Sequence, residues 1–346
     1  MKVAFVTHQL SFNYFGGMEV QMLRTKEHLE KLDVDVKFFD MWNDKIEDFD
    51  ILHIFGPAVF GNEAYNFIVT ARERNVKTIV SSIYWFSLKY HRMQSLKKRI
   101  FFHKLLFPLT RKVFGYFRSI EKVFRMADMV LPNSRAEAIL LKRLFGLDDS
   151  KIRVVHNAVD SLFKYGNQAL FERKLGLEDF ILFVGRIEDR KNVLNLIRAF
   201  RETDLDTNLV LIGRSASQKY LEMCKREADK RVVFLGPMKH EDPMLLSAYK
   251  ACKVVALPSY YETPGLTALE GALAGANIMV TAEGSAREYF GDYAWYVDPY
   301  NFDSIVVNLI RAYEAPKNTV LSTIVEENFT WEKVAEKTLQ AYEEII

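Results

Sequence analysis

Short apolar segments alternate with helical patterns along almost the whole chain, and this alternation restricts the fold more than any other feature. Strands that are apolar on both faces and separated by helices form parallel sheets covered by helices. The pattern occurs twice, so the sequence predicts an α/β protein with two Rossmann-like domains that face each other across a cleft. The predicted strands are KVAFVT, VDVKFF, DILHIF, VKTIVSS, DMVLPN and IRVVHN in the first half, and ILFVG, NLVLIG, RVVFLG, KVVALP, NIMVTA and AWYVD in the second.

The length of the chain also indicates two domains. At 346 residues the chain is long for a single hydrophobic core, and two domains of about 170 residues are the usual solution. Helical and strand periodicity weakens between Asp160 and Gly176. We therefore predict a first domain at residues 1–167 and a second at residues 168–327.

Apolar runs and cysteine usage indicate the compartment. The longest apolar runs are short, so no transmembrane helix is expected. The first residues, MKVAFVTHQ, predict a strand followed by polar residues and not a signal peptide. Cys224 and Cys252 are the only cysteines, and they are expected to be buried, unpaired thiols. Together these features favour a cytoplasmic protein.

The segment from Pro258 to Ala276, PSYYETPGLTALEGALAGA, carries the clearest chemical signal. The apolar segment before it predicts a buried strand, and a helix is expected to start near Thr267 after a glycine turn. A helix N-terminus presents unpaired N–H groups and a positive dipole end, which suit a phosphate. Glu262, before the turn, would face whatever the phosphate carries, and Glu270, inside the helix, would accept hydrogen bonds from paired hydroxyls such as those of a ribose. The arrangement predicts a nucleotide-sugar site.

This arrangement resembles the E-x7-E motif of the retaining GT-B glycosyltransferases of family 4, also called group 1. Further segments resemble the family in the same order along nearly the whole chain. They are HQLSFNYFGGMEVQ, LPNSRAEA, KIRVVHNAVD, ILFVGRIEDRKNVLNLIRAF, NLVLIGRS, RVVFLGPMKH, AYKACKVVALPS, GSAREYFGD and FTWEKVAEKTLQAYEEI. The resemblance implies that the first domain binds the acceptor and the second the donor. It also implies that the closing helix, in residues 328–346, packs back on the first domain.

The resemblance also implies roles for single residues. Arg186 and Lys191 would neutralise the diphosphate, Glu262 would hold sugar hydroxyls, and these three form the predicted catalytic set. Glu288 corresponds to a further glutamate of the family. The other donor-binding residues are expected to be Gly17, Gly185, Pro237, Met238, Gly265, Leu266, Thr267 and Glu270. Gly16, His53 and Tyr84 are candidates for acceptor or sugar contacts.

The chain departs from the family pattern at several positions. Many members carry a sugar-contacting histidine at the end of the strand TIVSSIYW, where this chain has Tyr84. His53, on the preceding strand, is an alternative contact or else a packed structural histidine. The usual glycine–phenylalanine pair after the first glutamate is here Thr263–Pro264, and Asn157–Ala158 replaces an asparagine–glycine turn. None of these changes removes a charged group.

The expected reaction is transfer of a sugar from a UDP- or GDP-linked donor, with retention at the anomeric carbon and without a metal or other cofactor. Arg186 and Lys191, as the resemblance implies, would already supply two cations to the leaving diphosphate. The D-x-D triplets at Asp33–Asp35 and Asp204–Asp206 and the seven scattered histidines do not have the spacing of a metal site. No dinucleotide fingerprint is present, which argues against hydride chemistry. Two alternatives stay open: a nucleotide-sugar epimerase of similar fold, and a non-catalytic, membrane-associated binding relative.

The segment from Lys89 to Arg125 is strongly basic. It holds eleven Lys or Arg residues and one acidic residue, Glu121, with aromatic residues between them. Positions Val113, Phe117, Ile120, Phe124 and Ala127 recur at helical spacing, which indicates an amphipathic helix with a solvated basic face. Cations mixed with aromatics also suit an anionic membrane surface, on the inner face of the membrane, with a lipid-linked or other glycan acceptor. Nucleic acid, whose phosphates attract the same charges, is not expected as a partner.

Overall fold

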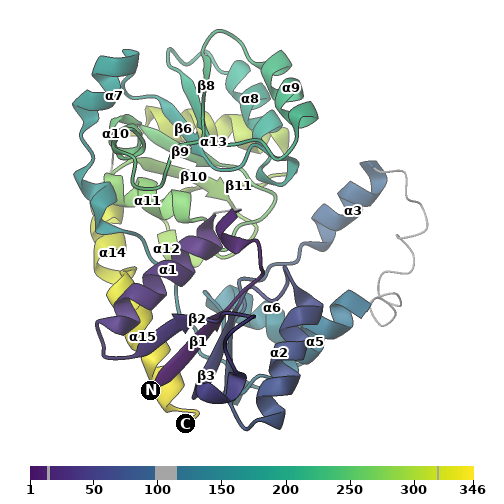
Figure 1. Cartoon of the computed structure of the whole chain (residues 1–346). Coiled ribbons are helices and arrows are strands. Elements are labelled where there is room, and N and C mark those ends of the chain that lie inside the picture. The colour runs from purple at the N-terminus through teal and green to yellow at the C-terminus, as the bar shows by residue number, and fades with distance from the viewer. Residues whose placement is uncertain (14–15, 98–114, 318) are drawn as a thin grey trace. The chain divides into compact units, whose positions relative to one another are not determined.

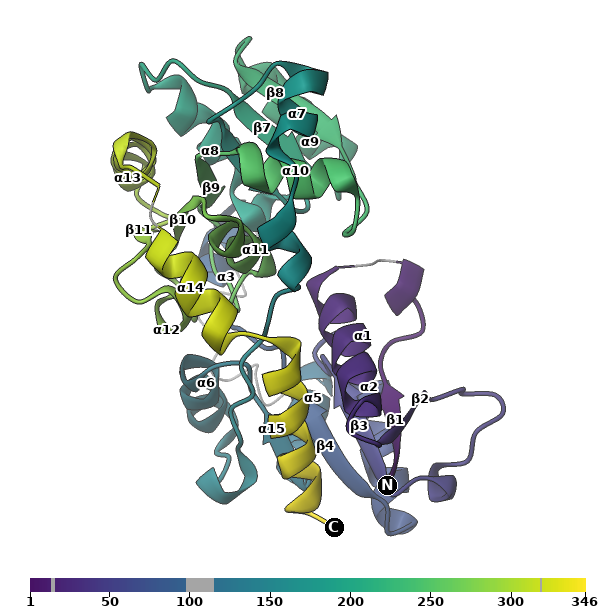
Figure 2. The same cartoon turned by 90° about the vertical axis from the view of Figure 1, so that its left-hand side faces the viewer.

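The structure is a computed structural model that describes residues 1–13, 16–97, 115–317 and 319–346 (Figures 1 and 2). The chain divides into two compact units. The first comprises Met1–Asn157 together with Trp331–Ile346, and the second comprises Ala158–Thr330. Each unit has its own parallel sheet and its own hydrophobic core. The prediction of two Rossmann-like α/β domains is therefore confirmed for each half of the chain.

The first unit contains a five-stranded parallel sheet in the order β2-β1-β3-β4-β5. Its strands are β1 (Lys2–Val6), β2 (Asp35–Phe38), β3 (Ile51–Phe55), β4 (Lys77–Ser81) and β5 (Met129–Leu131). Its helices are α1 (Gly17–Glu30), α2 (Gly61–Glu73), α3 (Leu88–Lys97), α5 (Gly115–Met126), α6 (Arg135–Phe145) and α15 (Trp331–Glu343), with short 3-10 turns η1 (Ser11–Asn13), η2 (Ile46–Asp48) and η3 (Asp149–Lys151).

The sixth strand that we predicted for this unit, IRVVHN, is not formed. Only Ile152 makes a bridge, to Val130 of β5, and the chain then continues as irregular structure. Two further backbone bonds follow the same edge, from Arg153 to Val130 and from Val155 to Pro132. The apolar pattern of this segment thus reflects packing against the edge of the sheet and not a full strand.

The second unit contains a six-stranded parallel sheet in the order β11-β10-β9-β6-β7-β8, and each of its strands matches one of the predicted segments. The strands are β6 (Ile181–Val184), β7 (Leu209–Ile212), β8 (Val232–Gly236), β9 (Val254–Leu257), β10 (Asn277–Thr281) and β11 (Trp295–Val297). The helices are α7 (Gln168–Leu175), α8 (Val193–Arg201), α9 (Gln218–Glu227), α10 (Pro243–Ala251), α11 (Leu266–Ala274), α12 (Ala286–Phe290), α13 (Phe302–Glu314) and α14 (Thr319–Asn328), with turns η4 (Ser161–Tyr165) and η5 (Asp189–Lys191).

The boundary between the units differs from the predicted one at residue 167. It lies between Asn157 and Ala158, because η4 packs on α10 and α11 and buries Phe163 in the second core. The weak helical and strand periodicity after Asp160 therefore reflects the short 3-10 turn η4 and not a linker between domains. The return crossing lies between Thr330 and Trp331, three residues beyond the predicted end of the second domain.

Helix α15 belongs to the first unit although it follows the second unit in the chain. It packs against α1, and its Tyr342 is fully buried with the hydroxyl 2.7 Å from Nδ1 of His53 on β3. Trp331, Val334 and Ala335 are also buried. Figures 1 and 2 show this helix, in yellow, beside the purple elements of the amino-terminal part. The chain therefore passes between the units twice.

The basic segment is described only in part. Residues 98–114, which include Lys98, Arg99, Phe101 and Phe102, lie outside the described residues. Within α5 the apolar positions Ile120 and Phe124 are fully buried, as the helical spacing predicts. In the part of the chain that the structure describes, no helix has the length and apolar character needed to cross a membrane.

Candidate active site

Two loops of the second unit meet where the direction of chain progress in the sheet reverses. From β6 the chain continues outward through β7 to β8, and then returns to build β9, β10 and β11 on the other side of β6. The carboxyl ends of neighbouring parallel strands at such a switch point diverge and leave room for a ligand. The loop after β6 carries Gly185, Arg186 and Lys191, and the loop after β9 carries Glu262. The two predicted catalytic segments therefore meet at one edge of the sheet.

Glu262 is the centre of this edge. It is only 5% exposed, and its Oε1 atom receives hydrogen bonds from the Lys191 ammonium and, at 2.6 Å, from the Ser259 hydroxyl. The Arg190 guanidinium lies 3.9 Å from the same oxygen and also pairs with Glu188 at 3.2 Å. Glu262 is thus a buried carboxylate held by one ammonium, one guanidinium and one hydroxyl.

The surrounding charges decide the ionisation of this pair. Burial by itself would raise the pKa of Glu262, but the charges of Lys191 and Arg190 and the hydrogen bonds from Lys191 and Ser259 hold it below its ordinary value. Burial lowers the pKa of Lys191, and the charge of Glu262 opposes this shift. The carboxylate is therefore ionised at neutral pH, with a cation directly beside it.

The backbone at Glu262 is fixed by the loop after β10. Its N–H donates to Glu283 at 3.1 Å, and its carbonyl accepts from the N–H of Ser285 at 3.1 Å. Gly284 stands between these bonds with φ +128°, and a Cβ atom there would lie 1.9 Å from the Glu262 carbonyl oxygen. Only glycine allows this approach, so three strand ends together define where the carboxylate sits.

Helix α11 begins directly after this loop. Its N-cap is Gly265, at φ +88°, which has no side chain to cap the N–H groups of Leu266 and Thr267. The Thr267 hydroxyl donates at 3.2 Å to the carbonyl of Val184, the last residue of β6. The helix start is thereby held against the strand that leads to Arg186 and Lys191. A helix N-terminus with uncapped N–H groups is a common phosphate-binding position in proteins.

Glu270, one turn further along α11, is 6% exposed and lies in a second polar cluster. Its Oε2 atom accepts a hydrogen bond from the Tyr249 hydroxyl, and its Oε1 atom lies 3.6 Å from Nδ1 of His240. The other ring nitrogen of His240 lies 3.2 Å from Asp160. Both predicted glutamates are therefore buried, and each has its own set of partners.

The remaining predicted residues of the second unit lie at or near the same strand ends. Arg186 is exposed, whereas Arg190 is the arginine found near Glu262. Pro237 and Met238 directly follow β8, at the outer end of the sheet, with Met238 packed against the core. Glu288 is half-buried in the short helix α12, which follows the loop that fixes Glu262.

Two candidates in the first unit, His53 and Tyr84, are buried. His53 is fully buried in the middle of β3, between Tyr342 and the Ser81 hydroxyl at 2.8 Å, and burial lowers its pKa to about 3. This is the packed structural histidine of the two alternatives. Tyr84 is 7% exposed and its ring packs on Phe124 and Phe145, so the apolar core takes up this side chain.

Gly16 and Gly17 begin α1, as the glycine-rich loop predicts. The N–H of Gly16 donates at 2.8 Å to Glu19, a buried carboxylate that also accepts from the Ser11 hydroxyl at 2.8 Å. The imidazole of His8 lies 3.8 Å from the same carboxylate. Glu19 thus connects Ser11 and His8 with the start of α1.

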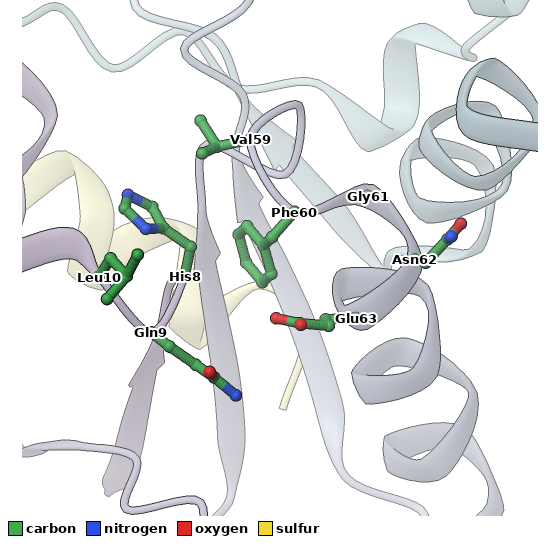
Figure 3. Close-up of a pocket in the computed structure, with 8 residues that line it drawn as sticks. All are labelled: His8, Gln9, Leu10, Val59, Phe60, Gly61, Asn62 and Glu63. Carbon is green, nitrogen blue, oxygen red and sulfur yellow. The ribbon is translucent and has the colours of Figure 1, made fainter.

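A pocket of about 420 Å³ opens at the switch point of the first sheet, where the loops after β1 and β3 diverge (Figure 3). One wall comes from the loop after β1, and the other from the loop after β3 and the start of α2. Its lining combines polar and apolar side chains, namely His8, Gln9, Leu10, Val59, Phe60, Gly61, Asn62 and Glu63.

Comparison with protein families agrees with this arrangement. Residues 170–328 match the family model "Glycosyl transferases group 1", and residues 15–161 match "Glycosyltransferase Family 4". The two matched ranges correspond to the two units. The chain therefore belongs to the group 1 glycosyltransferases, also called family 4, and the two models describe its two parts.

Among curated proteins, this glycosyltransferase chain is similar to D-inositol 3-phosphate glycosyltransferase of Kribbella flavida. The two are 32% identical over 246 residues, which cover 64% of this chain and 58% of the relative. The chain spans 58% or less of the length of the first curated relatives that it matches.

Among solved structures, sucrose-phosphate synthase from Thermosynechococcus elongatus has a TM-score of 0.78 at 18% identity, with 99% of both chains covered. Anabaena HepE, solved in complex with UDP-glucose, has a TM-score of 0.76 at 15% identity and covers 99% of this chain and 100% of its own. At such identities the likeness concerns the fold. It supports the GT-B type of two Rossmann-like halves.

Several residues of this candidate site escaped sequence reasoning. Ser259 and Arg190 adjoin predicted positions, but neither has a spacing that indicates contact with Glu262. His240 follows Met238 by two residues and is the only histidine of the second unit, which was a usable signal. Asp160 and Tyr249 are 110 and 21 residues away from Glu270, and only the fold brings them to it.

Proposed function

We propose that this protein is a retaining glycosyltransferase that moves a sugar from a nucleotide-sugar donor to an acceptor. The observation that carries the proposal is the Lys191–Glu262 pair at the switch point of the second sheet, beside the uncapped start of α11. A diphosphate needs cations and free N–H groups, and a sugar needs a carboxylate that accepts hydroxyl protons. Both requirements meet at one edge of one sheet.

In the proposed reaction the sugar–diphosphate bond breaks, and negative charge develops on the leaving nucleotide. Arg186 and Lys191 would neutralise this charge, with the N–H groups at Gly265, Leu266 and Thr267 as further donors. Since Lys191 is already held by Glu262, its ammonium is oriented before the donor arrives. Gly17, Gly185, Pro237 and Met238 would complete the donor contacts, as the family resemblance implies.

Glu262 would hold hydroxyls of the transferred sugar, and Glu270 the two ribose hydroxyls. Retention would follow from attack on the same face of the sugar, assisted by the leaving phosphate, as the resemblance implies, so Glu262 is not a covalent nucleophile here. The donor would be UDP- or GDP-linked, and two protein cations would serve in place of a metal ion. The UDP-glucose that the HepE structure contains supports the UDP-linked option.

The acceptor would bind the first unit at the pocket of Figure 3. His8, Gln9, Asn62 and Glu63 offer donors and acceptors for the hydroxyls of a polyol or glycan. Leu10 and Val59, both exposed apolar residues of the lining, suit a neighbouring apolar group. A lipid-linked or other glycan precursor fits this mixture, and the inositol phosphate named for the Kribbella flavida relative fits its polar part.

A cytoplasmic location, peripheral on the inner face of the membrane, would bring the enzyme to such an acceptor. Eleven cations between Lys89 and Arg125 would each contribute about 1 kcal/mol near an anionic bilayer. Within the described part, the Lys122 ammonium lies over the Tyr65 ring and the Arg125 guanidinium donates to the Phe145 carbonyl. These two cations therefore also contribute to the packing of the first unit. Flotation with anionic and neutral vesicles at low salt tests this location, and equal recovery with both would exclude it.

The test of the function is a donor screen followed by a transfer assay. UDP- and GDP-sugars are first ranked by thermal shift, and the best donor is then incubated with candidate polyol, glycan and lipid-linked acceptors. Acceptor-dependent release of nucleotide, with an α-linked product from an α-linked donor, supports the proposal. A change of sugar isomer without release supports an epimerase, and binding without either reaction supports a binding protein. Loss of transfer on chelation, restored by Mg²⁺ or Mn²⁺, would contradict the metal-free mechanism.

A further inference from the structure

A histidine stands between the half-buried Asp160 and the buried Glu270 at the proposed ribose end of the donor site. Nε2 of His240 lies 3.2 Å from Asp160, and Nδ1 lies 3.6 Å from Glu270. The side chains of Asp160 and Glu270 are 10% and 8% exposed. The ring of Phe163 packs edge-on against the imidazole, with centroids 5.1 Å apart. The cluster is therefore packed into the second unit and is not an ion pair on the open surface.

The contacts of this cluster depend on whether the His240 imidazole is protonated. An ionised carboxylate accepts hydrogen bonds and donates none, so Nε2 must carry a hydrogen where it bonds to Asp160 at 3.2 Å. Nδ1 lies 3.6 Å from Glu270, which is an ion-pair distance and not a hydrogen bond. A neutral ring can donate to Asp160 but offers no positive charge to Glu270, whereas the protonated ring does both. The observed placement of His240 between two acceptors therefore suits the imidazolium form.

The same cluster controls the charge of Glu270. Burial raises the pKa of Glu270, the negative charge of Asp160 raises it further, and His240 together with the Tyr249 hydrogen bond works in the opposite direction. Loss of positive charge from His240 would remove the cation that offsets the negative charge of Asp160 at Glu270. Glu270 would then take up a proton more readily and become a poorer acceptor for hydroxyls.

We propose that His240 is a positioning residue of the donor site, and that its protonated ring, anchored by Asp160, keeps Glu270 ionised and oriented for the two ribose hydroxyls. The inference rests on the proposed function, because it concerns how Glu270 binds the nucleotide. Asp160 is the third residue of the second unit, so the anchor lies directly after the crossing from the first unit. Donor binding is thereby coupled to a protonation equilibrium outside the diphosphate clamp.

The groups around His240 come from three parts of the second unit. Asp160 and Phe163 lie at the start of the second unit, Tyr249 is on α10, and Glu270 is on α11. The chain neighbours Lys239 and Glu241 are exposed to solvent. Tyr249 stays protonated, since burial and Glu270 raise its pKa well above the ordinary value. The protonation equilibrium of this cluster therefore concerns His240 and Glu270.

The sign of the pH dependence follows from these two groups. Glu270 must be ionised to accept two hydroxyls, so nucleotide affinity falls as pH decreases through the titration of Glu270. His240 must be protonated to support Glu270, so affinity also falls as pH increases through the titration of the ring. The wild-type protein is therefore expected to bind nucleotide best between two limbs, and the alkaline limb belongs to His240.

Isothermal titration calorimetry of the full chain with UDP and GDP, from about pH 5.5 to about pH 8.5, measures both limbs. His240→Gln is expected to weaken nucleotide binding about tenfold at the wild-type optimum. The variant should lose the alkaline limb, and its acid limb should move to higher pH. The phosphate of the ligand titrates identically with every variant, so it cancels in the ratio of affinities.

Two further variants separate charge balance from shape. Asp160→Asn together with His240→Gln removes both the cation and one carboxylate, so the acid limb should return toward lower pH while the alkaline limb stays absent. Asp160→Asn alone keeps the titrating ring but removes its anchor, and the alkaline limb should then move to lower pH. This single variant also serves if His240→Gln does not fold.

The matched control is His28→Gln in the first unit. His28 also faces a carboxylate, Glu332 at 3.3 Å, but lies outside the second unit. It should leave the pH profile of nucleotide binding unchanged. If wild-type protein binds neither UDP nor GDP, the proposed function fails and this inference with it. If wild-type protein binds nucleotide and His240→Gln keeps both limbs, only the role of His240 is overturned.

Discussion

At the scale of single residues, the buried ion pair at the switch point provides the most direct test of the proposed chemistry. Lys191→Ala should lower the transfer rate by about two orders of magnitude, because it removes a preorganised cation and leaves Glu262 buried with less counter-charge. Arg186→Ala should have an effect of similar size on transfer but little on stability, since Arg186 is exposed. Steady-state transfer kinetics and thermal unfolding measure both effects.

The controls for this pair are Lys225→Ala and Arg226→Ala, two exposed cations on α9 of the same unit. Neither should change the transfer rate. Near-normal transfer by both Lys191→Ala and Arg186→Ala would show that the diphosphate is held elsewhere.

A second residue, Glu137, makes the stability of the first unit depend on pH. It is fully buried and accepts hydrogen bonds from the Ser82 hydroxyl and from the N–H groups of Tyr84 and Asn133. Burial outweighs these bonds and raises the pKa of Glu137 to about 7. The unfolded chain has an ordinary carboxyl pKa, so the stabilisation is complete at low pH and is lost as pH rises toward about 7.

The size of this effect is on the order of 3 kcal/mol in the free energy of unfolding. In Glu137→Gln that part of the pH dependence should disappear. Urea unfolding of wild type and variant between about pH 4.5 and about pH 8 measures the difference. Parallel stability curves for the two proteins would show that Glu137 does not titrate in this range.

At the scale of elements, the contact between α11 and β9 sets the position of the helix that carries Glu270. A Cβ atom at Gly271 would lie 2.4 Å from Cγ2 of Val255 on β9. Gly271→Ala should therefore push the helix away from the sheet, destabilise the second unit by about 1–3 kcal/mol and weaken nucleotide binding. Thermal unfolding and calorimetry with UDP measure the two effects.

The matched rescue is Val255→Ala in the same chain, because it removes Cγ2, the atom that the new Cβ would approach most closely. Gly271→Ala with Val255→Ala should bind UDP better than Gly271→Ala alone, although Val255→Ala by itself leaves a cavity. If the double variant binds UDP no better than Gly271→Ala, the spacing between α11 and β9 is not what limits binding.

At the scale of the whole molecule, the first unit depends on α15, which follows the second unit in the sequence. Ending the chain at Thr330 removes Trp331, Val334, Ala335 and Tyr342, each buried in the first unit. The larger of these buried side chains contribute roughly 2 kcal/mol each, and a domain is stable by only about 5–15 kcal/mol. The first unit should then lose most of its structure, while the second keeps its own core.

Hydrogen exchange resolves the two units in one experiment. In the shortened chain, amides of β1, β3 and β4 should lose protection while those of β6, β7 and β9 keep it. Tyr342→Phe is the control, since it removes only the hydrogen bond to His53 and should cost about 1 kcal/mol. Unchanged protection of the first sheet in the shortened chain would contradict the closing role of α15.

The sequence by itself determined the elements and the chemistry of the two main segments. Short apolar runs of three or four residues located all six strands of the second sheet, because burial on both faces leaves a local pattern. The spacing of Glu262 and Glu270 around a glycine located a helix start with one carboxylate on either side of it. Such features depend on neighbours within a few residues, so the chain alone carries them.

Only the tertiary structure decided which distant groups meet. Lys191 and Glu262 are 71 residues apart, and Asp160 and His240 are 80 residues apart. The same cause buried His53 and Tyr84, which sequence reasoning offered as possible ligand contacts, and kept IRVVHN as irregular structure along the edge of β5. Which side chains touch depends on strand order and on the packing of each helix on its sheet, and these are properties of the folded chain as a whole.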